Sequence, residues 1–161
     1  MKKVLITGGA GYIGTVLTEL LLSKGHKVTI YDNLMYDGSL LIPFFNNENF
    51  DFIKGDIVDT EKMKKSIEDV DVVIHLAAIV GYQACDNNKR LTNDVNVDGT
   101  QALVDMMRDD QYLLFGSTGS NYGIVDGICT EETSLNPSTL YGVTKTEAES
   151  IVMTKENSTA F

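Results

Sequence analysis

The sequence predicts an α/β domain in which helices cover both faces of a parallel sheet. Short runs rich in β-branched and aromatic residues alternate along the chain with longer stretches of helical period. These short runs are apolar throughout, which is typical of strands buried on both faces. A strand, a helix and a second strand in succession favour a right-handed crossover between parallel strands. The chain has 161 residues, the size of one domain, so we expect a single α/β domain over residues 1–161.

Five runs are expected to form strands, because they are too short for helices and rich in Val, Ile, Leu and aromatic residues. They are Lys3–Thr7, Lys27–Tyr31, Phe50–Lys54, Val70–Leu76 and Tyr112–Phe115. The last residues, Ser158–Phe161, have the composition of one more strand at its start. A strand that stops there leaves a sheet edge unpaired. We therefore expect a fragment of a longer chain, without its last strands and its C-terminal substrate domain.

Four stretches between the strands have a helical period. They are Tyr12–Ser23, Thr60–Ile67, Asn93–Arg108 and Tyr141–Lys155. Gly25 is a good residue to end the first helix, and Glu61 suits the positively charged start of the second. The connections Asp32–Asn49 and Gly116–Thr139 are long and follow predicted strands. Long loops in such positions are usually functional.

The composition excludes several kinds of partner. Hydrophobic residues make up 43% of the chain, too many for a disordered segment. The 13 Lys and Arg against 23 Asp and Glu give a net charge of −10, which argues against nucleic acid and anionic membranes as partners. No apolar run approaches the roughly 20 residues that a membrane span needs. Cys85 and Cys129 lie far apart in the sequence, which favours two reduced thiols and a cytoplasmic location.

A glycine-rich turn follows the first predicted strand. Gly8, Gly11 and Gly14 have a spacing related to the dinucleotide-binding fingerprint. In that fingerprint the first glycine permits the tight turn, the second lets the backbone approach a pyrophosphate, and the third allows close packing of the helix. The start of the helix at Tyr12 and Ile13 then faces the phosphates. Glycines cluster in any tight turn, so the flanking strand and helix give the motif its weight.

An acid at the end of the second strand strengthens this interpretation. Asp32 stands where a carboxylate accepts hydrogen bonds from the ribose of a bound dinucleotide. The stretch Val28–Ile53 contains no Lys or Arg to pair with a 2′-phosphate, so NAD is favoured over NADP. Asp56 ends the third strand, where it is either a partner of the adenine amine or an ordinary turn residue. The pattern as a whole predicts a Rossmann-type NAD-binding domain.

A tyrosine and a lysine lie one helical turn apart at Tyr141 and Lys145. An ammonium beside a phenol stabilises the phenolate, which lets a tyrosine act as a general acid or base. This spacing often arises by chance, so the pair carries little weight alone. Its place after the fifth strand, downstream of a nucleotide-binding turn, makes it a candidate for catalysis.

Four motifs in this order resemble those of the extended short-chain dehydrogenase/reductases, and more narrowly the NAD-dependent sugar-nucleotide epimerase/dehydratase branch. The motifs are Thr7–Gly14, His75–Ala78, Asn96–Thr100 and the pair Tyr141 and Lys145, and the resemblance runs from Lys2 to Lys155. It implies a Rossmann-type fold, NAD as the cofactor and a nucleotide-activated sugar as the substrate.

The resemblance also implies individual roles. Tyr141 takes the position of the catalytic acid/base, and Lys145 that of the lysine that assists it and holds the nicotinamide ribose. Thr118 stands where the family has a catalytic Ser or Thr, whose hydroxyl bonds the substrate oxygen that loses or gains a proton. Ser120 is expected to touch the substrate, and Asn96 resembles an asparagine of the helix after the fourth strand. Further residues expected at the cofactor are Asn33, Ile57, Leu76, Ala77 and Ala78.

The loop after the fifth strand departs from the dehydratases of the family. Those enzymes carry an Asp-Glu pair directly after the catalytic Thr, where this chain has Gly119 and Ser120. Neither residue is an acid or a base, so epimerisation or simple oxidation–reduction is favoured over dehydration. Asn121 replaces a small apolar residue, with no predicted consequence. His75 has no second metal ligand at a useful spacing, so we expect a structural histidine and no metal site.

These observations together predict an NAD-dependent oxidoreductase or epimerase that acts on a nucleotide-activated sugar. The alternative is an NAD-binding module without turnover. In relatives, the helices that correspond to Asn93–Arg108 and Tyr141–Lys155 pack against a second subunit, so we expect a homodimer. Apolar residues available for that interface are Val97, Ala102, Val104, Ala148, Ile151 and Val152.

Overall fold

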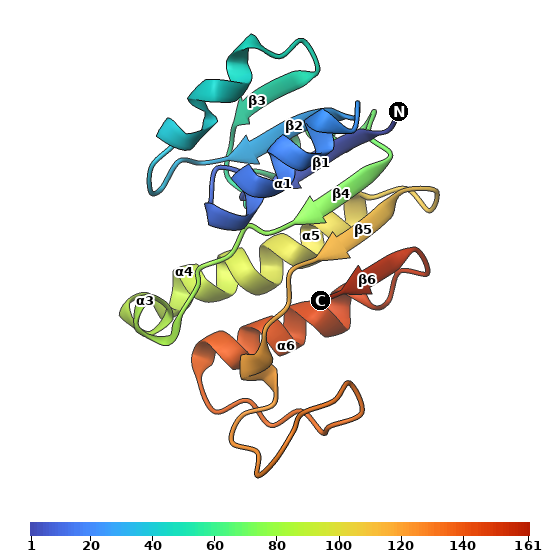
Figure 1. The fold of residues 1–161 in the computed structure, drawn as a ribbon. Coiled ribbons are helices and arrows are strands. Elements are labelled where there is room, and N and C mark those ends of the chain that lie inside the picture. The colour runs from blue at the N-terminus through green and yellow to red at the C-terminus, as the bar shows by residue number, and fades with distance from the viewer.

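The computed structural model describes residues 1–161 and contains one six-stranded sheet with parallel strand pairs (Figure 1). Its strands are β1 (Lys3–Thr7), β2 (Lys27–Asp32), β3 (Phe50–Lys54), β4 (Val72–His75), β5 (Tyr112–Phe115) and β6 (Ser158–Ala160). Their order is β3-β2-β1-β4-β5-β6, so the direction of winding reverses between β1 and β4. The predicted doubly wound sheet is confirmed. Ligands of such sheets bind beyond the carboxyl ends of the strands at this reversal.

The central strands are buried on both faces, which explains their unbroken apolar runs. Leu5, Val73 and Leu113 belong to the larger core cluster on one face of the sheet. Ile6 and Ile74, their neighbours along β1 and β4, belong to a second cluster. Successive side chains of a strand point to opposite faces, so both sets are needed to bury this sheet.

Helices cover the sheet on two sides, with α1 on one side and α5 and α6 on the other (Figure 1). Leu17 and Leu21 of α1 (Tyr12–Ser23) pack against the smaller core. Leu103 of α5 and Ala148 of α6 lie in the larger core. The helices on this second side are α2 (Thr60–Ile67), α5 (Gly99–Met106) and α6 (Leu140–Val152). None of the helices has the length and apolar character that crossing a membrane requires.

The predicted helix over Asn93–Arg108 is present, but it ends at Met106 and is not a regular α-helix throughout. The chain instead forms α4 (Lys89–Asn93), one stretch of π-helix over Asp94–Asp98, and then α5. A π-helical turn adds a residue to the helical repeat, and such turns are frequent at functional sites. A pattern of apolar residues at helical spacing does not reveal this insertion.

Short helices also occur where the sequence predicts loops. Cys85 is buried within α3 (Tyr82–Asn87), a helix that the sequence does not predict. The two long connections contain 3-10 helices at Ser39–Asn46 and Gly119–Asn121. At the end of the chain β6 pairs in parallel with β5, which confirms the strand expected to start at Ser158.

Most apolar residues expected at a subunit interface lie in the core of the domain. Val97, Val104, Ala148 and Val152 are buried within the chain itself. Helical spacing identifies an apolar face but does not tell whether that face meets a sheet or a second subunit. Only Ala102 and Ile151 of the expected set remain partly accessible.

Candidate active site

The glycine turn crosses directly over the end of β4. Gly8 has a φ of 68°, and a Cβ atom at this position would lie 2.6 Å from the backbone nitrogen of Ala77. At Gly14 a Cβ atom would lie 2.5 Å from the Cα atom of Gly9. The third glycine of the motif therefore lets α1 begin against the turn itself, rather than against a strand.

The first turn of α1 is open toward the end of the sheet. Its N-cap residue, Gly11, has no side chain to cap the helix, and no other side chain does so. The first N–H groups of a helix have no partner within the helix and carry a partial positive charge. This end of α1 is therefore available to an anionic group such as a pyrophosphate.

Asp32 joins the end of β2 to the glycine turn. One carboxylate oxygen accepts a hydrogen bond from the backbone N–H of Ala10 at 3.0 Å, and the other accepts from the N–H of Leu34 at 2.8 Å. Leu34 has a φ of 59°, which turns the chain sharply after β2. Both bonds leave further acceptor sites on the carboxylate for a ligand.

Asp56 is tied to the same region from the end of β3. Its carboxylate accepts a hydrogen bond from the Asn33 amide at 2.9 Å, and its backbone carbonyl accepts one from the Tyr31 hydroxyl at 2.9 Å. Burial, together with the carboxylates of Asp59 and Asp56, raises the pKa of Tyr31 to about 12. Tyr31 is therefore a neutral hydrogen-bond donor that supports the site.

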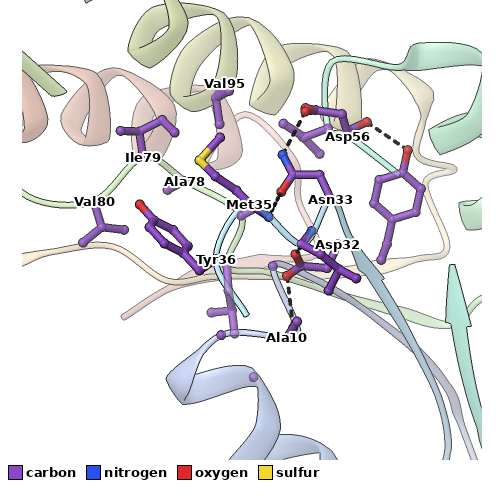
Figure 2. Close-up of a pocket in the computed structure, with 18 of the residues that line it drawn as sticks. Ala10, Asp32, Asn33, Met35, Tyr36, Asp56, Ala78, Ile79, Val80 and Val95 are labelled. Carbon is purple, nitrogen blue, oxygen red and sulfur yellow. Dashed lines mark hydrogen bonds between the residues drawn. The ribbon is translucent and has the colours of Figure 1, made fainter. Parts of the chain in front are cut away.

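A cavity of about 370 Å³ lies where these segments meet. Figure 2 shows Asp32, Asn33 and Asp56 on one part of its wall, with Met35 pointing toward Ile79 and Val95. Every predicted cofactor residue that precedes Asn96 lines this cavity: Gly8, Gly11, Tyr12, Ile13, Gly14, Asp32, Asn33, Asp56, Ile57, Leu76, Ala77 and Ala78. No Lys or Arg lines it. Its size is typical of a small-molecule site, and its charged groups, Asp32, Asp37 and Asp56, are all acidic.

Asn96 lies behind the cavity rather than in its wall. The Asn96 side chain accepts a hydrogen bond from the Ile79 N–H at 2.8 Å and donates to the Ile79 carbonyl at 3.0 Å. It also donates to the Thr144 hydroxyl of α6 at 3.1 Å. Asn96 is buried in the π-helical turn and connects the segment that lines the cavity to the helix of Tyr141.

Lys145 is buried at the start of the loop after β5. It is 3% exposed, and its ammonium group donates to the Gly116 carbonyl at 2.5 Å and lies 3.7 Å from the centre of the Phe115 ring. Burial lowers the pKa of Lys145 to about 8, and the nearby Glu149 carboxylate opposes this shift. The lysine therefore carries a positive charge at neutral pH, in a site with little water.

His75 is buried between two threonine hydroxyls at the end of β4. Its ring nitrogens lie 2.6 Å from the Thr7 hydroxyl and 3.0 Å from the Thr100 hydroxyl. Burial and the Lys145 charge lower the pKa of His75 to about 3, so the ring is neutral at physiological pH. No group of three or more metal-binding side chains occurs in the structure.

Thr118 and Ser120 lie in the loop that packs on the start of α6. The Thr118 hydroxyl accepts a hydrogen bond from the Ser120 N–H at 3.2 Å and caps the short 3-10 helix. A Cβ atom at Gly142 of α6 would lie 2.7 Å from the Ser120 carbonyl oxygen. The loop and the first turns of α6, which carry Tyr141, are thus in close contact. The predicted catalytic residues come from these two segments and do not line the 370 Å³ cavity.

Glu149 was not identified from the sequence. Its carboxylate accepts hydrogen bonds from the Ser117 hydroxyl and from the Asn121 amide, the latter at 2.9 Å. The only available signal was its position one helical turn after Lys145, because its partners are about 30 residues away in the chain. The same contact explains Asn121, whose role the sequence leaves open.

The sheet and its glycine turn define a dinucleotide-binding domain. The chain belongs to the NAD dependent epimerase/dehydratase family, which matches residues 4–160. It is 36% identical over 159 residues to the "Uncharacterized UDP-glucose epimerase YtcB" of Bacillus subtilis strain 168, and the match covers 92% of this chain and 50% of that protein. It is also 36% identical over 155 residues to a UDP-glucose 4-epimerase of Lactobacillus helveticus, with 93% of this chain and 46% of that protein covered.

The solved structures that this chain resembles also include NAD-bound epimerases. The chain is similar to the UDP-glucuronic acid 4-epimerase from Bacillus cereus, crystallised in complex with UDP-glucuronic acid and NAD. The TM-score is 0.89 at 29% identity, and the match covers 98% of this chain and 55% of that one. The chain therefore spans about half the length of the relatives that it matches.

Proposed function

We propose that this chain is the NAD-binding part of an NAD-dependent oxidoreductase or epimerase that acts on a nucleotide-activated sugar. The observation that carries the proposal is the contact between Lys145 and the Gly116 carbonyl at 2.5 Å. This contact brings the helix with the family's Tyr and Lys onto the loop with Thr118. Membership of the family and the names of the relatives support the reaction class.

The residues around the cavity fit NAD. Asp32 offers carboxylate oxygens to a ribose, the open end of α1 offers N–H groups to a pyrophosphate, and no cation is present for a 2′-phosphate. The small side chains of Ala77 and Ala78 let a ligand approach the backbone after β4. Lys145 is assigned to the nicotinamide ribose by its place in the family motif.

The chemistry follows from the side chains of the second segment. NAD, when bound, supplies the acceptor and donor of hydride. Tyr141, as the phenolate that the Lys145 ammonium stabilises, takes the proton of a sugar hydroxyl as a general base and becomes the neutral phenol. Thr118 bonds the same sugar oxygen through its hydroxyl. Gly119 and Ser120 provide no acid or base for the loss of water, which favours epimerisation or oxidation–reduction over dehydration.

The competing function is an NAD-binding module without turnover. The cavity that fits NAD is lined without Thr118 or Tyr141, so cofactor binding does not depend on the groups proposed for the chemistry. In that case the cavity would bind NAD, while Tyr141 would have no substrate to act on.

The experiment combines a calorimetric titration of NAD with steady-state turnover on UDP-, dTDP-, GDP- and CDP-sugars. We expect NAD to bind, and Tyr141→Phe to lower any turnover by about 100-fold or more, because a general acid–base residue contributes that much. Tyr112→Phe, which removes a hydroxyl from a half-exposed tyrosine of β5, is the matched control. Binding of NAD without Tyr141-dependent turnover would favour the module, and failure to bind NAD would contradict both functions.

A further inference from the structure

Hydrogen bonds connect both ends of the segment after β5, residues 116–121, to α6. At the first end, Lys145 donates to the Gly116 carbonyl, and one helical turn later Glu149 accepts the hydroxyl of Ser117. At the far end, the Asn121 amide donates to the same Glu149 oxygen at 2.9 Å. The three residues between these ends include Thr118 and carry the proposed contacts to the substrate.

The cluster of Ser117, Asn121 and Glu149 uses every side-chain donor that it contains. The Asn121 amide gives one hydrogen to the Ser117 oxygen at 3.0 Å and the other to Glu149, and Ser117 gives its hydrogen to Glu149. One oxygen of Glu149 thus accepts two hydrogen bonds. Without an acceptor at position 149, the half-buried Ser117 hydroxyl and one N–H of the Asn121 amide would have no partner.

Asn121 is held in place by this cluster rather than by its own acceptor. Its side chain is 2% exposed, and its Oδ1 atom is buried without a hydrogen-bond partner. A buried polar atom without a partner is unusual in a native protein and calls for an explanation. Here the amide is oriented by Glu149 and Ser117, and the backbone carbonyl of Asn121 accepts the N–H of Asn136, which joins the next part of the loop.

We propose that Glu149 is a positioning residue that holds the Thr118 segment at a fixed place on the helix of Tyr141 and Lys145. This inference rests on the function proposed above. The Thr118 loop and α6 pack closely, because the Ser120 carbonyl oxygen lies 2.7 Å from the place that a Cβ atom of Gly142 would occupy. A displacement of about 1 Å between reacting groups is enough to slow a reaction by about 100-fold.

Glu149 also acts on Lys145 through its charge. Lys145 interacts electrostatically with Glu149 on the same helix and with His75 on β4, of which His75 is neutral. Tyr141 precedes Lys145 by one helical turn. The Glu149 carboxylate raises the pKa of Lys145 against the effect of burial. Glu149→Gln keeps an oxygen acceptor and removes the charge, whereas Glu149→Ala removes both. The two variants therefore separate the two effects.

The test compares Glu149→Ala, Glu149→Gln and Glu147→Ala, an exposed position of the same helix. We expect Glu149→Ala to lower kcat about tenfold or more, while KM and the Kd for NAD change by less than about twofold. Glu149→Gln should restore most of kcat near pH 7. Because it removes the charge that raises the pKa of Lys145, the alkaline limb of the pH profile of kcat should move to lower pH. Hydrogen exchange at the Asn121 N–H, which donates to the Thr118 carbonyl, should become faster in Glu149→Ala only.

Unchanged kcat and exchange in Glu149→Ala would overturn the inference, and so would a kcat that Glu149→Gln does not restore. The exchange measurement needs neither NAD nor substrate. If NAD binding and Tyr141-dependent turnover are absent, the proposed function fails. Hydrogen exchange at the Asn121 N–H still tests whether Glu149 keeps the Thr118 segment in place. If Glu149→Ala does not fold, Ser117→Ala replaces it, because it removes the two hydrogen bonds of the Ser117 hydroxyl and leaves the Glu149 charge.

Discussion

The carboxylate of Asp32 accepts a hydrogen bond from the backbone N–H of Ala10 at 3.0 Å, which ties the end of β2 to the glycine turn. The acid expected to recognise a ribose therefore also fixes the turn expected to recognise a pyrophosphate. Ligand binding and local folding depend on the same side chain at this point. Because a carboxylate has more acceptor sites than these contacts use, the two roles are compatible.

NAD should bind at least about tenfold more tightly than NADP, a difference of about 1.4 kcal/mol. The 2′-phosphate of NADP would meet Asp32 and find no Lys or Arg in the cavity wall. Calorimetric titration of one preparation with both dinucleotides measures the ratio. Asp32→Ser should reduce the preference for NAD over NADP. Asp69→Ser replaces an exposed acid at a distant position and should leave this preference unchanged. Equal affinities of the unaltered chain for the two would contradict this role of Asp32.

Gly8→Ala should destabilise the fold more than Gly25→Ala does. Both glycines have a positive φ, at 68° and 77°, so alanine is strained at either position. Only at Gly8 would the new Cβ atom also meet backbone, 2.6 Å from the nitrogen of Ala77, whereas nothing lies within 4 Å at Gly25. We expect a further loss of about 1–3 kcal/mol at Gly8, measured by urea unfolding. Equal losses in the two variants would argue against a close approach of the turn to β4.

The sequence predicted the parts of this fold that depend on local pattern. The five strands are visible because residues such as Leu5 and Ile6 are apolar on both faces of a buried sheet. The π-helical turn around Asn96 was missed, because one added residue does not disturb the spacing of apolar side chains enough to be seen. The six-residue helix of Cys85 was missed, because only one of its residues is buried.

In the candidate site too, residues placed by local pattern could be predicted and contacts between distant segments could not. Gly8, Gly14 and Asp32 could be found because their spacing follows from one strand, one turn and one helix. The contact of Glu149 with Asn121 could not be found, because it joins side chains that are 28 residues apart and meet only in the folded chain. Such contacts depend on the packing of a loop on a helix, which no local spacing specifies.

The free energy of unfolding should rise as the pH increases from about 8 to 10.5. A free lysine has a pKa of 10.5, and burial lowers that of Lys145 to about 8, so the unfolded chain holds this proton over a window in which the folded chain has lost it. The full difference corresponds to about 3 kcal/mol. Lys145→Met should remove this rise, whereas Lys64→Met at an exposed site should retain it. Chemical denaturation at a series of pH values gives the slopes, and identical slopes in the three proteins would contradict the prediction.

The chain should form a homodimer through α5 and α6, as the resemblance implies. Because Val97 and Val152 are buried within the domain, the apolar surface left for a second subunit is smaller than the sequence suggested. This surface includes Val143 of α6, which is 44% exposed. Val143→Glu places a charge on this surface and should convert the dimer to single subunits. Val16→Glu, on the exposed side of α1, should leave it intact. Light scattering at micromolar concentration measures the mass, and one subunit in the unaltered chain would rule the dimer out.

The 161 residues should bind NAD but turn over sugar nucleotides about 100-fold or more slowly than a complete relative, a loss of about 2.7 kcal/mol of transition-state stabilisation. The residues assigned to NAD, from Gly8 to Lys145, are present, and so are Thr118 and Tyr141. The resemblance assigns the nucleotide part of the substrate to the half of the relatives that has no counterpart here. Binding energy from that remote part orients the reacting sugar, so without it kcat falls as well as affinity.

The measurement is steady-state turnover of the 161-residue chain on the panel of sugar nucleotides, beside a complete relative such as the Lactobacillus helveticus enzyme. Tyr141→Phe gives the background, because it removes the general base and leaves the NAD residues in place. A reduced kcat with NAD affinity retained would show that cofactor binding and substrate orientation are separate properties of the two halves. Rates equal to those of the relative, abolished by Tyr141→Phe, would contradict the prediction, because the cavity and the Thr118 loop would then suffice to orient the sugar.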